Sequence, residues 1–199
     1  MTAQTVDAAD RKTADVNAPD NGQRRDDRVL NYRLDVVASD TSDVVRLIGG
    51  WLYDRTAAGW DVSVLAPQHT DTRPLQIIGV RAADLASVLA APISAFAGHG
   101  VVVSSGIFAS DARVRDMVRT ALACRTTEVT LIDDGWPLAV GNRTTAVRHE
   151  LSAAARAFKR HALAAAGISS TVGPTETLRR PDRTNVTLAS LWLPSVTPA

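Results

Sequence analysis

The chain has 199 residues, of which 45% are hydrophobic and 22% are charged, and its formal net charge is +1. These values are ordinary for a globular protein and predict one domain with tails. A net charge so close to zero excludes a strong attraction of the whole molecule to nucleic acid or to an anionic membrane. Arginine far outnumbers lysine, which is typical of proteins from GC-rich bacterial genomes.

The single cysteine, Cys124, excludes a disulfide framework or a cysteine-based zinc site within one chain. Its alanine and leucine neighbours indicate a buried structural role. Residues 1–20 lack the apolar core of a secretory signal, and no stretch approaches the roughly 20 apolar residues of a membrane span. We therefore expect a cytoplasmic protein that does not bind membranes.

The polar residues 1–28 contain almost no large apolar side chains and are predicted to form a disordered N-terminal arm. Residues 29–39 are predicted to be the first strand. The cap-forming cluster Ser39–Asp43 then precedes a helix with apolar residues at helical spacing, interrupted by Gly49-Gly50. After Gly59, the second strand is expected at residues 60–65. This strand, helix, strand pattern is typical of a parallel sheet.

The polar segment 67–74 is too short for a recognisable crossover helix, so residues 75–80 are predicted to be a third strand, antiparallel to the second at the sheet edge. A helix is expected at 82–90. The β-branched run 101–105 is predicted to be a central fourth strand, and residues 127–132 a fifth.

Further elements are expected around and beyond the fifth strand. Ser110 and Asp111 are predicted to cap a helix before it, and a long helix is expected from 145 to 166. Prolines break up residues 167–199, which are predicted to be a partly irregular tail with one short strand or docking segment at 185–193.

These elements assemble into a three-layer α/β domain over residues 29–166. The predicted architecture is a Rossmann-like mixed sheet in the order 3-2-1-4-5, with strand 3 antiparallel at the edge and helices on both faces. Ligands of such sheets bind beyond the carboxyl ends of the strands, where the strand order reverses. That point lies between strands 1 and 4.

We expect a crevice at this point, and polar residues gather in the loops that would line it. The candidate site residues are Asp40, Thr41, Asp43, Ser104, Ser105 and Asp133. Carboxylates and hydroxyls at strand ends could hold Mg²⁺ or orient a polar substrate. All six are also ordinary helix-capping or turn residues, and this interpretation has the stronger support from the sequence.

No established catalytic motif is present. The SDTSD segment after strand 1 lacks the glycines of a dinucleotide fingerprint, and its carboxylates would repel a phosphate. The chain has neither a P-loop nor a GxSxG elbow. The scattered histidines favour surface or capping roles, so no cofactor is predicted, and Mg²⁺ is expected only if the crevice is an active site.

The C-terminal third carries clustered basic residues, among them Arg156, Lys159 and Arg160 on the predicted long helix. Interspersed acidic residues and the lack of interleaved aromatics favour a solvated outer face over a nucleic-acid surface. Trp192, in the apolar segment near the end, could cover the sheet edge or dock on a protein partner or second subunit.

Three functions fit these observations. The favoured expectation is a non-enzymatic regulatory or accessory module that acts through protein contacts. The alternative is a small-molecule-binding enzyme, a metal-assisted hydrolase or transferase, with its site at the ends of strands 1 and 4. A weaker alternative is nucleic-acid association through the basic C-terminal segment. The first two differ in whether the side chains of Asp40, Asp43, Ser104 and Asp133 line one pocket.

Overall fold

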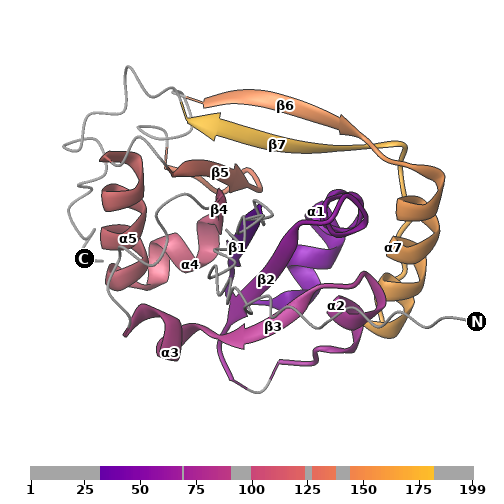
Figure 1. Cartoon of the computed structure of the whole chain (residues 1–199), viewed down its shortest axis with the longest axis horizontal. Coiled ribbons are helices and arrows are strands. Elements are labelled where there is room, and N and C mark those ends of the chain that lie inside the picture. Colours follow the sequence, from indigo (N-terminus) through magenta and orange to yellow (C-terminus); the bar gives the residue numbers. More distant parts are fainter. Residues whose placement is uncertain (1–31, 69, 91–99, 124–126, 138–143, 182–199) are drawn as a thin grey trace, which may run out of the picture.

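A computed structural model describes residues 32–68, 70–90, 100–123, 127–137 and 144–181 of the chain (Figure 1). Cys124, Trp192 and the predicted segment 185–193 lie outside these residues, as do residues 1–28. Within them the strands are β1 (Arg33–Val37), β2 (Asp61–Ala66), β3 (Arg81–Asp84), β4 (Gly100–Ser104), β5 (Glu128–Ile132), β6 (Thr144–Glu150) and β7 (Thr175–Pro181). The helices are α1 (Thr41–Ala57), α2 (Arg73–Ile77), α3 (Leu85–Leu89), α4 (Ser105–Ser110), α5 (Ala112–Ala123) and α7 (Ala153–Ala165).

The described strands form one mixed sheet in the order β3-β2-β1-β4-β5-β7-β6. The predicted α/β class and the order 3-2-1-4-5 are confirmed. Strands β3, β2, β1, β4 and β5 run parallel to one another. The buried, β-branched sequences of β1 and β4 suit central strands that are covered on both faces. The order reverses between β1 and β4, as expected.

The predicted direction of strand 3 is wrong. Residues 73–77 form α2, with Pro74 at its start, and Gly79 reverses the chain with φ +74°. The strand itself is Arg81–Asp84, and it pairs with β2 in parallel. The short α2 supplies the crossover that segment 67–74 lacks, so the chain returns to the starting end of the sheet before β3 begins.

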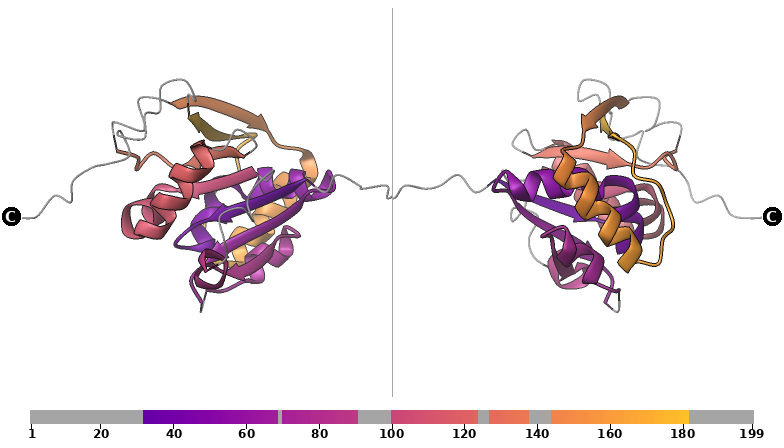
Figure 2. Two further views of the ribbon diagram at one scale, coloured as in Figure 1. Left: turned by 60° about the vertical axis from the view of Figure 1, so that its left-hand side comes forward. Right: turned by 90° about the vertical axis from the view of Figure 1, so that its right-hand side faces the viewer.

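The predicted helix over 145–166 is also wrong in its first part. Residues 144–150 form β6, which pairs antiparallel with β7 along its whole length, and the helix starts only at Ala153. The two strands are the last two of the sheet on the side of β5, and α7 lies beside α1 (Figures 1 and 2). Strand β7 lies inside the sheet although its residues fall in the predicted tail range. The limits of arm, domain and tail stay predictions.

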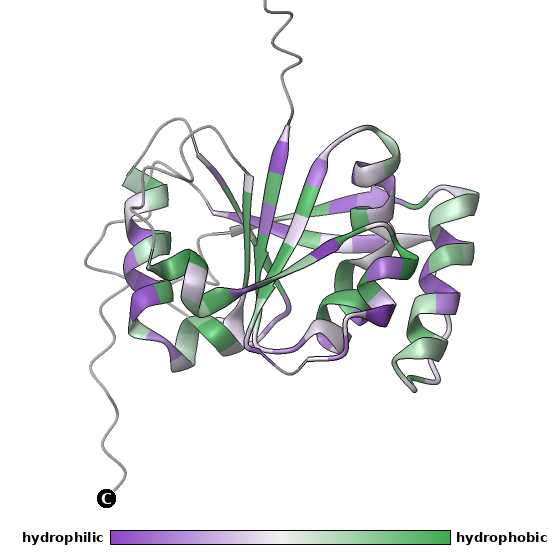
Figure 3. Ribbon diagram, turned by 60° about the horizontal axis from the view of Figure 1, so that its bottom comes forward, coloured by the Kyte–Doolittle hydropathy of each residue, from purple (hydrophilic) through white to green (hydrophobic). Residues whose placement is uncertain are grey.

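The hydrophobic core has one part on each face of the sheet. Helices α1, α2 and α7 cover one face around Ile48 and Leu52, and α4 and α5 cover the other around Phe108 and Met117. Hydrophobic residues gather on the central strands and on the sides of the helices that face them (Figure 3). At roughly 25 cal/mol per Å² of buried apolar surface, these two layers supply the main stabilisation and hold the strand ends in place. The described residues contain no helix with the length and apolarity to cross a membrane.

Candidate functional site

A pocket of about 170 Å³ lies at the carboxyl ends of β1, β4 and β5, where the strand order reverses. We call this pocket the crevice. Five of the six candidate residues line it, and they are Asp40, Asp43, Ser104, Ser105 and Asp133. Ser39, Arg46 and Gly106 also line it and were not among the candidates. Asp40, Asp43, Ser104 and Asp133 therefore line one pocket, as an enzyme site would require.

Thr41 does not belong to this site. It is buried in the first turn of α1, and its hydroxyl donates a hydrogen bond to the carbonyl oxygen of Asp71 at 3.1 Å. This contact fastens the start of α1 to the loop before α2. The sequence places Thr41 in the segment that lines the crevice. It does not reveal that the first turn of α1 directs the Thr41 hydroxyl away from the crevice.

Asp40 and Asp43 already have partners inside α1. The Oδ1 atom of Asp40 accepts a hydrogen bond from the Ser42 amide at 2.9 Å and caps the helix. Oδ1 of Asp43 accepts from Nε and Nη2 of Arg46, at 3.1 and 2.8 Å. The expected capping role of Asp40 is thus confirmed, while Arg46 brings a positive charge to the rim of an otherwise acidic crevice.

Asp133 connects the ends of β5 and β4. Its Oδ2 accepts a hydrogen bond from the Ser105 amide at 3.0 Å, and its Oδ1 accepts from the Gly135 amide at 3.1 Å. Its backbone has φ +68°, the only non-glycine residue with a positive φ in the described part of the chain. Such a conformation costs free energy, and aspartate tolerates it better than most residues. A Cβ at Gly135 would lie 2.5 Å from the Ser105 hydroxyl, so a larger residue there would displace the Ser105 side chain.

Ser104 differs from the other candidates because its hydroxyl has no partner. The residue is 7% exposed, and its Oγ atom is buried without a hydrogen bond to any described residue. A buried hydroxyl that makes no hydrogen bond costs roughly 1–3 kcal/mol. Gly106, two residues further along, lets α4 approach the loop between β1 and α1: a Cβ there would lie 3.3 Å from the Ser39 hydroxyl. A residue that lines a pocket and has an unpartnered hydroxyl is suited to bind a polar ligand.

A metal site does not assemble from the described residues. They contain no group of three or more His, Cys, Asp or Glu side chains placed to hold an ion. In the crevice, the carboxylates of Asp40 and Asp133 accept hydrogen bonds from backbone amides, and the carboxylate of Asp43 accepts from Arg46.

A larger pocket of about 430 Å³ adjoins the crevice and shares Arg46, Leu47 and Asp133 with it. We call it the Lys159 pocket. It is lined by residues of α1, α7 and β7, including Lys159, Glu176 and Arg179. Lys159 was expected on a solvated helix face. Its side chain is instead only 7% exposed and bonds Glu176, which weakens the case for a basic nucleic-acid surface on this helix.

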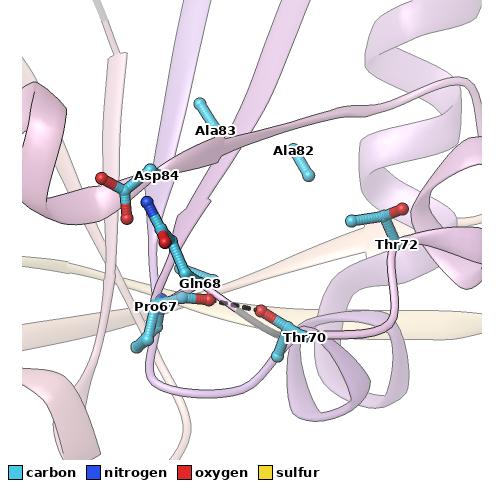
Figure 4. Close-up of a pocket in the computed structure, with 8 residues that line it drawn as sticks. Pro67, Gln68, Thr70, Thr72, Ala82, Ala83 and Asp84 are labelled. Carbon is cyan, nitrogen blue, oxygen red and sulfur yellow. Dashed lines mark hydrogen bonds between the residues drawn. The ribbon is translucent and has the colours of Figure 1, made fainter.

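A third pocket, of about 190 Å³, lies at the ends of β2 and β3 (Figure 4). Thr70 donates its hydroxyl hydrogen bond to the Pro67 carbonyl at 2.6 Å. Asp84 caps α3 by accepting from the hydroxyl and the amide of Ser87, and these bonds hold the pKa of Asp84 below its ordinary value. Two alanines, Ala82 and Ala83, form another part of the wall. The polar groups named here are used in local turns, so this pocket offers little chemistry.

His149 contacts a carboxylate of α1 and does not line the crevice. Its Nε2 lies 2.9 Å from Oδ2 of Asp54, which also accepts a hydrogen bond from the Ser152 amide at 3.2 Å. Burial acts to raise the pKa of Asp54, but hydrogen bonds from Ser152 and His149 together lower it below its ordinary value. The pair joins α1 to the β6–α7 connection. It neither lines the crevice nor adds a base to it.

No family model matches the chain, and no curated protein matches it. Among solved structures, the chain is similar to the crystal structure of the antimicrobial reagent A40926 pseudoaglycone deacetylase Dbv21. The identity is 11% and the TM-score is 0.45, over 75% of this chain and 96% of that one. At this distance the likeness carries no assignment of activity.

The expectation of a non-enzymatic contact module is corrected here. It depended on the absence of an assembled site, and the structure places Asp40, Asp43, Ser104 and Asp133 around one pocket. The alternative, a small-molecule site at the ends of β1 and β4, is the better account.

Proposed function

We propose that this protein is a small-molecule-binding enzyme, a hydrolase or transferase, whose active site is the crevice between the ends of β1 and β4. One observation carries the proposal: Ser104 lines the crevice, and its buried hydroxyl has no hydrogen-bond partner among the described residues. A bound substrate that supplies a polar atom would recover the free energy that this unpaired group costs.

The lining of the crevice favours an uncharged polar group of the substrate. Asp40, Asp43 and Asp133 contribute three carboxylates and Arg46 one cation, so the net charge is negative. A phosphate would be repelled there. A hydroxyl or amide group, in contrast, can both donate to and accept from the Ser104 hydroxyl.

Ser104 is proposed to bind and orient the substrate. A serine nucleophile requires a base within hydrogen-bond reach, and Oγ of Ser104 contacts no such group in the described residues. Its place at the junction of β4 and α4 fixes the side chain on regular backbone on both sides. Holding a reacting group in one orientation is a recognised source of rate enhancement.

A thermal-shift screen tests the proposal. The probes are uncharged polyols and amides, with nucleotides and Mg²⁺ as further arms, and every hit is followed by NMR for hydrolysis or group transfer. We expect stabilisation by uncharged polar compounds, and a threefold to tenfold weaker binding of the hit by Ser104→Ala, as for the loss of about 1 kcal/mol. The matched control is Ser110→Ala, because the exposed Ser110 hydroxyl bonds only carbonyls of its own helix.

The proposal fails if no uncharged compound stabilises the protein, or if Ser104→Ala and Ser110→Ala bind the hit equally well. If a compound binds at Ser104 but is never converted, the protein binds a small molecule but is not an enzyme for it, and the enzymatic part of the proposal is wrong. Cytoplasmic location and assembly through the segment around Trp192 stay proposals of their own. Sedimentation of the full chain and of Trp192→Ala tests the latter.

A further inference from the structure

The Lys159 pocket contains two buried side chains of opposite charge. Nζ of Lys159 donates to Oε1 of Glu176 and, at 2.7 Å, to the carbonyl oxygen of Arg46 in α1. The side chains of Lys159 and Glu176 are 7% and 4% exposed. Burying two charges costs several kcal/mol, so their position on the wall of a pocket requires an explanation beyond stability.

Each carboxylate oxygen of Glu176 and Asp133 already accepts at least one hydrogen bond. Oε1 of Glu176 accepts from Lys159 and from the Gly50 amide, and Oε2 accepts from the Trp51 amide at 2.7 Å. The two oxygens of Asp133 accept from backbone amides. The remaining carboxylate, Asp134, has a side chain that is 86% exposed and bonds Arg179.

The cationic groups, in contrast, keep unused donors. An ammonium has three N–H donors, and Lys159 uses two of them. Arg46 bonds only Asp43, through Nε and Nη2, and Arg179 bonds only Asp134 through the same two atoms. The Nη1 group of each guanidinium is therefore free within the described residues. A pocket whose carboxylate oxygens are already hydrogen-bonded, and whose three cations keep free donors, is suited to an anionic group.

We propose that the Lys159 pocket binds the carboxylate of a small molecule. A single negative charge fits better than a phosphate, because Asp133 and Asp134 line the same pocket and repel a doubly charged group. Since the two pockets share Arg46 and Asp133, the uncharged polar part of the same molecule reaches Ser104 in the crevice. This second part rests on the proposed function, and the first part does not.

The experiment is an NMR titration of the full chain with two pairs of probes. Acetate and acetamide differ only in charge at the carboxyl position, and gluconate and gluconamide add a chain of hydroxyls. We expect each carboxylate to bind about tenfold more tightly than its amide, as for a charge-assisted hydrogen bond near 1.4 kcal/mol. The preference should also weaken as salt is raised.

Two neighbouring arginines provide the variant and its control. Arg179→Gln removes a lining cation, and Arg46→Gln removes another. Arg180→Gln removes an exposed cation that is paired with Glu128 and lies outside the Lys159 pocket. We expect Arg179→Gln and Arg46→Gln to abolish the preference for the carboxylate and Arg180→Gln to keep it. Substitution of Lys159 is avoided here because it would leave Glu176 buried and unpaired.

The outcomes separate the two proposals. Equal binding of carboxylates and amides, no binding of either carboxylate, or a preference that survives Arg179→Gln would overturn the carboxylate site. Inorganic phosphate binding more tightly than acetate would overturn the choice of a singly charged group. If Ser104→Ala leaves gluconate binding unchanged while Arg179→Gln weakens it, the carboxylate site stands and the proposed function of the crevice falls.

Discussion

The Nζ atom of Lys159 lies 2.5 Å from Oε1 of Glu176, and both side chains are more than nine-tenths buried. Glu176 also accepts from the amides of Gly50 and Trp51, while Lys159 donates to the Arg46 carbonyl. The pair therefore joins α7 and β7 to the backbone of α1. It forms the wall of the Lys159 pocket and couples the shape of that pocket to the stability of the fold.

Breaking this pair on one side should destabilise the protein strongly. Lys159→Met leaves an uncompensated buried carboxylate, and we expect a loss of about 3–5 kcal/mol in the free energy of unfolding, measured by urea denaturation. The double variant Lys159→Met with Glu176→Gln removes both charges and should regain part of this loss. Arg180→Gln breaks the exposed pair with Glu128 and should cost at most about 1 kcal/mol. Equal effects of Lys159→Met and Arg180→Gln would contradict the buried coupling.

Gly50 and Gly49 should respond differently to a methyl group. A Cβ at Gly50 would lie 2.6 and 2.8 Å from the two Cδ atoms of Leu151 and 3.2 Å from Glu176 Oε1, whereas at Gly49 the nearest atom is a Val45 methyl at 3.3 Å. Alanine gains roughly 1 kcal/mol in helix propensity at either position. We expect overpacking to exceed this gain at position 50, with a net loss of about 1–2 kcal/mol in urea unfolding, and Gly49→Ala to be close to neutral. A Gly50→Ala protein as stable as Gly49→Ala would refute the close contact.

The decrease in the free energy of unfolding at acidic pH should depend on Asp54. Its pKa is lowered in the folded protein, so the folded state holds this proton less readily than the unfolded state. Its contribution is therefore fully present above the ordinary value of 3.8 and is lost as pH falls below 3.8 through the lowered pKa. Asp54→Asn should flatten the decline of stability below that pH in denaturation curves. Asp116→Asn, which alters an exposed pair with Arg119, should leave the slope unchanged.

Asp133 allows the structural role of a crevice residue to be separated from ligand binding. The amide side chain of an Asp133→Asn variant keeps one acceptor, and asparagine also tolerates a positive φ, so we expect a loss of about 1 kcal/mol. Asp133→Ala loses both amide contacts and is strained at φ +68°, so we expect about 2–3 kcal/mol. Thermal and urea unfolding measure both. The strain is refuted if Asp133→Gly, which has no Cβ, is no more stable than Asp133→Ala.

The sequence predicted the half of the fold in which local pattern and tertiary environment agree. Strands β1 and β4 are buried on both faces and rich in valine, and the cap at Asp40 marks the start of α1. The crevice followed from this order alone. That Ser104 would be the unpartnered hydroxyl was not visible, because hydrogen bonding depends on neighbours from other strands.

The predictions were wrong where the local sequence pattern does not match the tertiary environment of the segment. The β-branched run at 75–80 resembles a strand, but Pro74 starts a helical turn, and the true edge strand Arg81–Asp84 is mostly exposed and has no apolar alternation. Strand β6 is exposed or half-buried throughout, so its sequence shows no inward face. Lys159 looked solvated because the glutamate that buries it comes 17 residues later.

The contact between Glu176 and α1 also bears on how the chain is made. Gly50 and Glu176 are 126 residues apart in sequence. During synthesis, α1 leaves the ribosome well before its carboxylate partner exists, and β7 is inserted between β5 and β6 only when residues 175–181 have emerged. Contacts of such long sequence separation slow folding. The nascent protein therefore completes the Lys159 pocket late, and this pocket cannot hold a ligand before translation has passed β7.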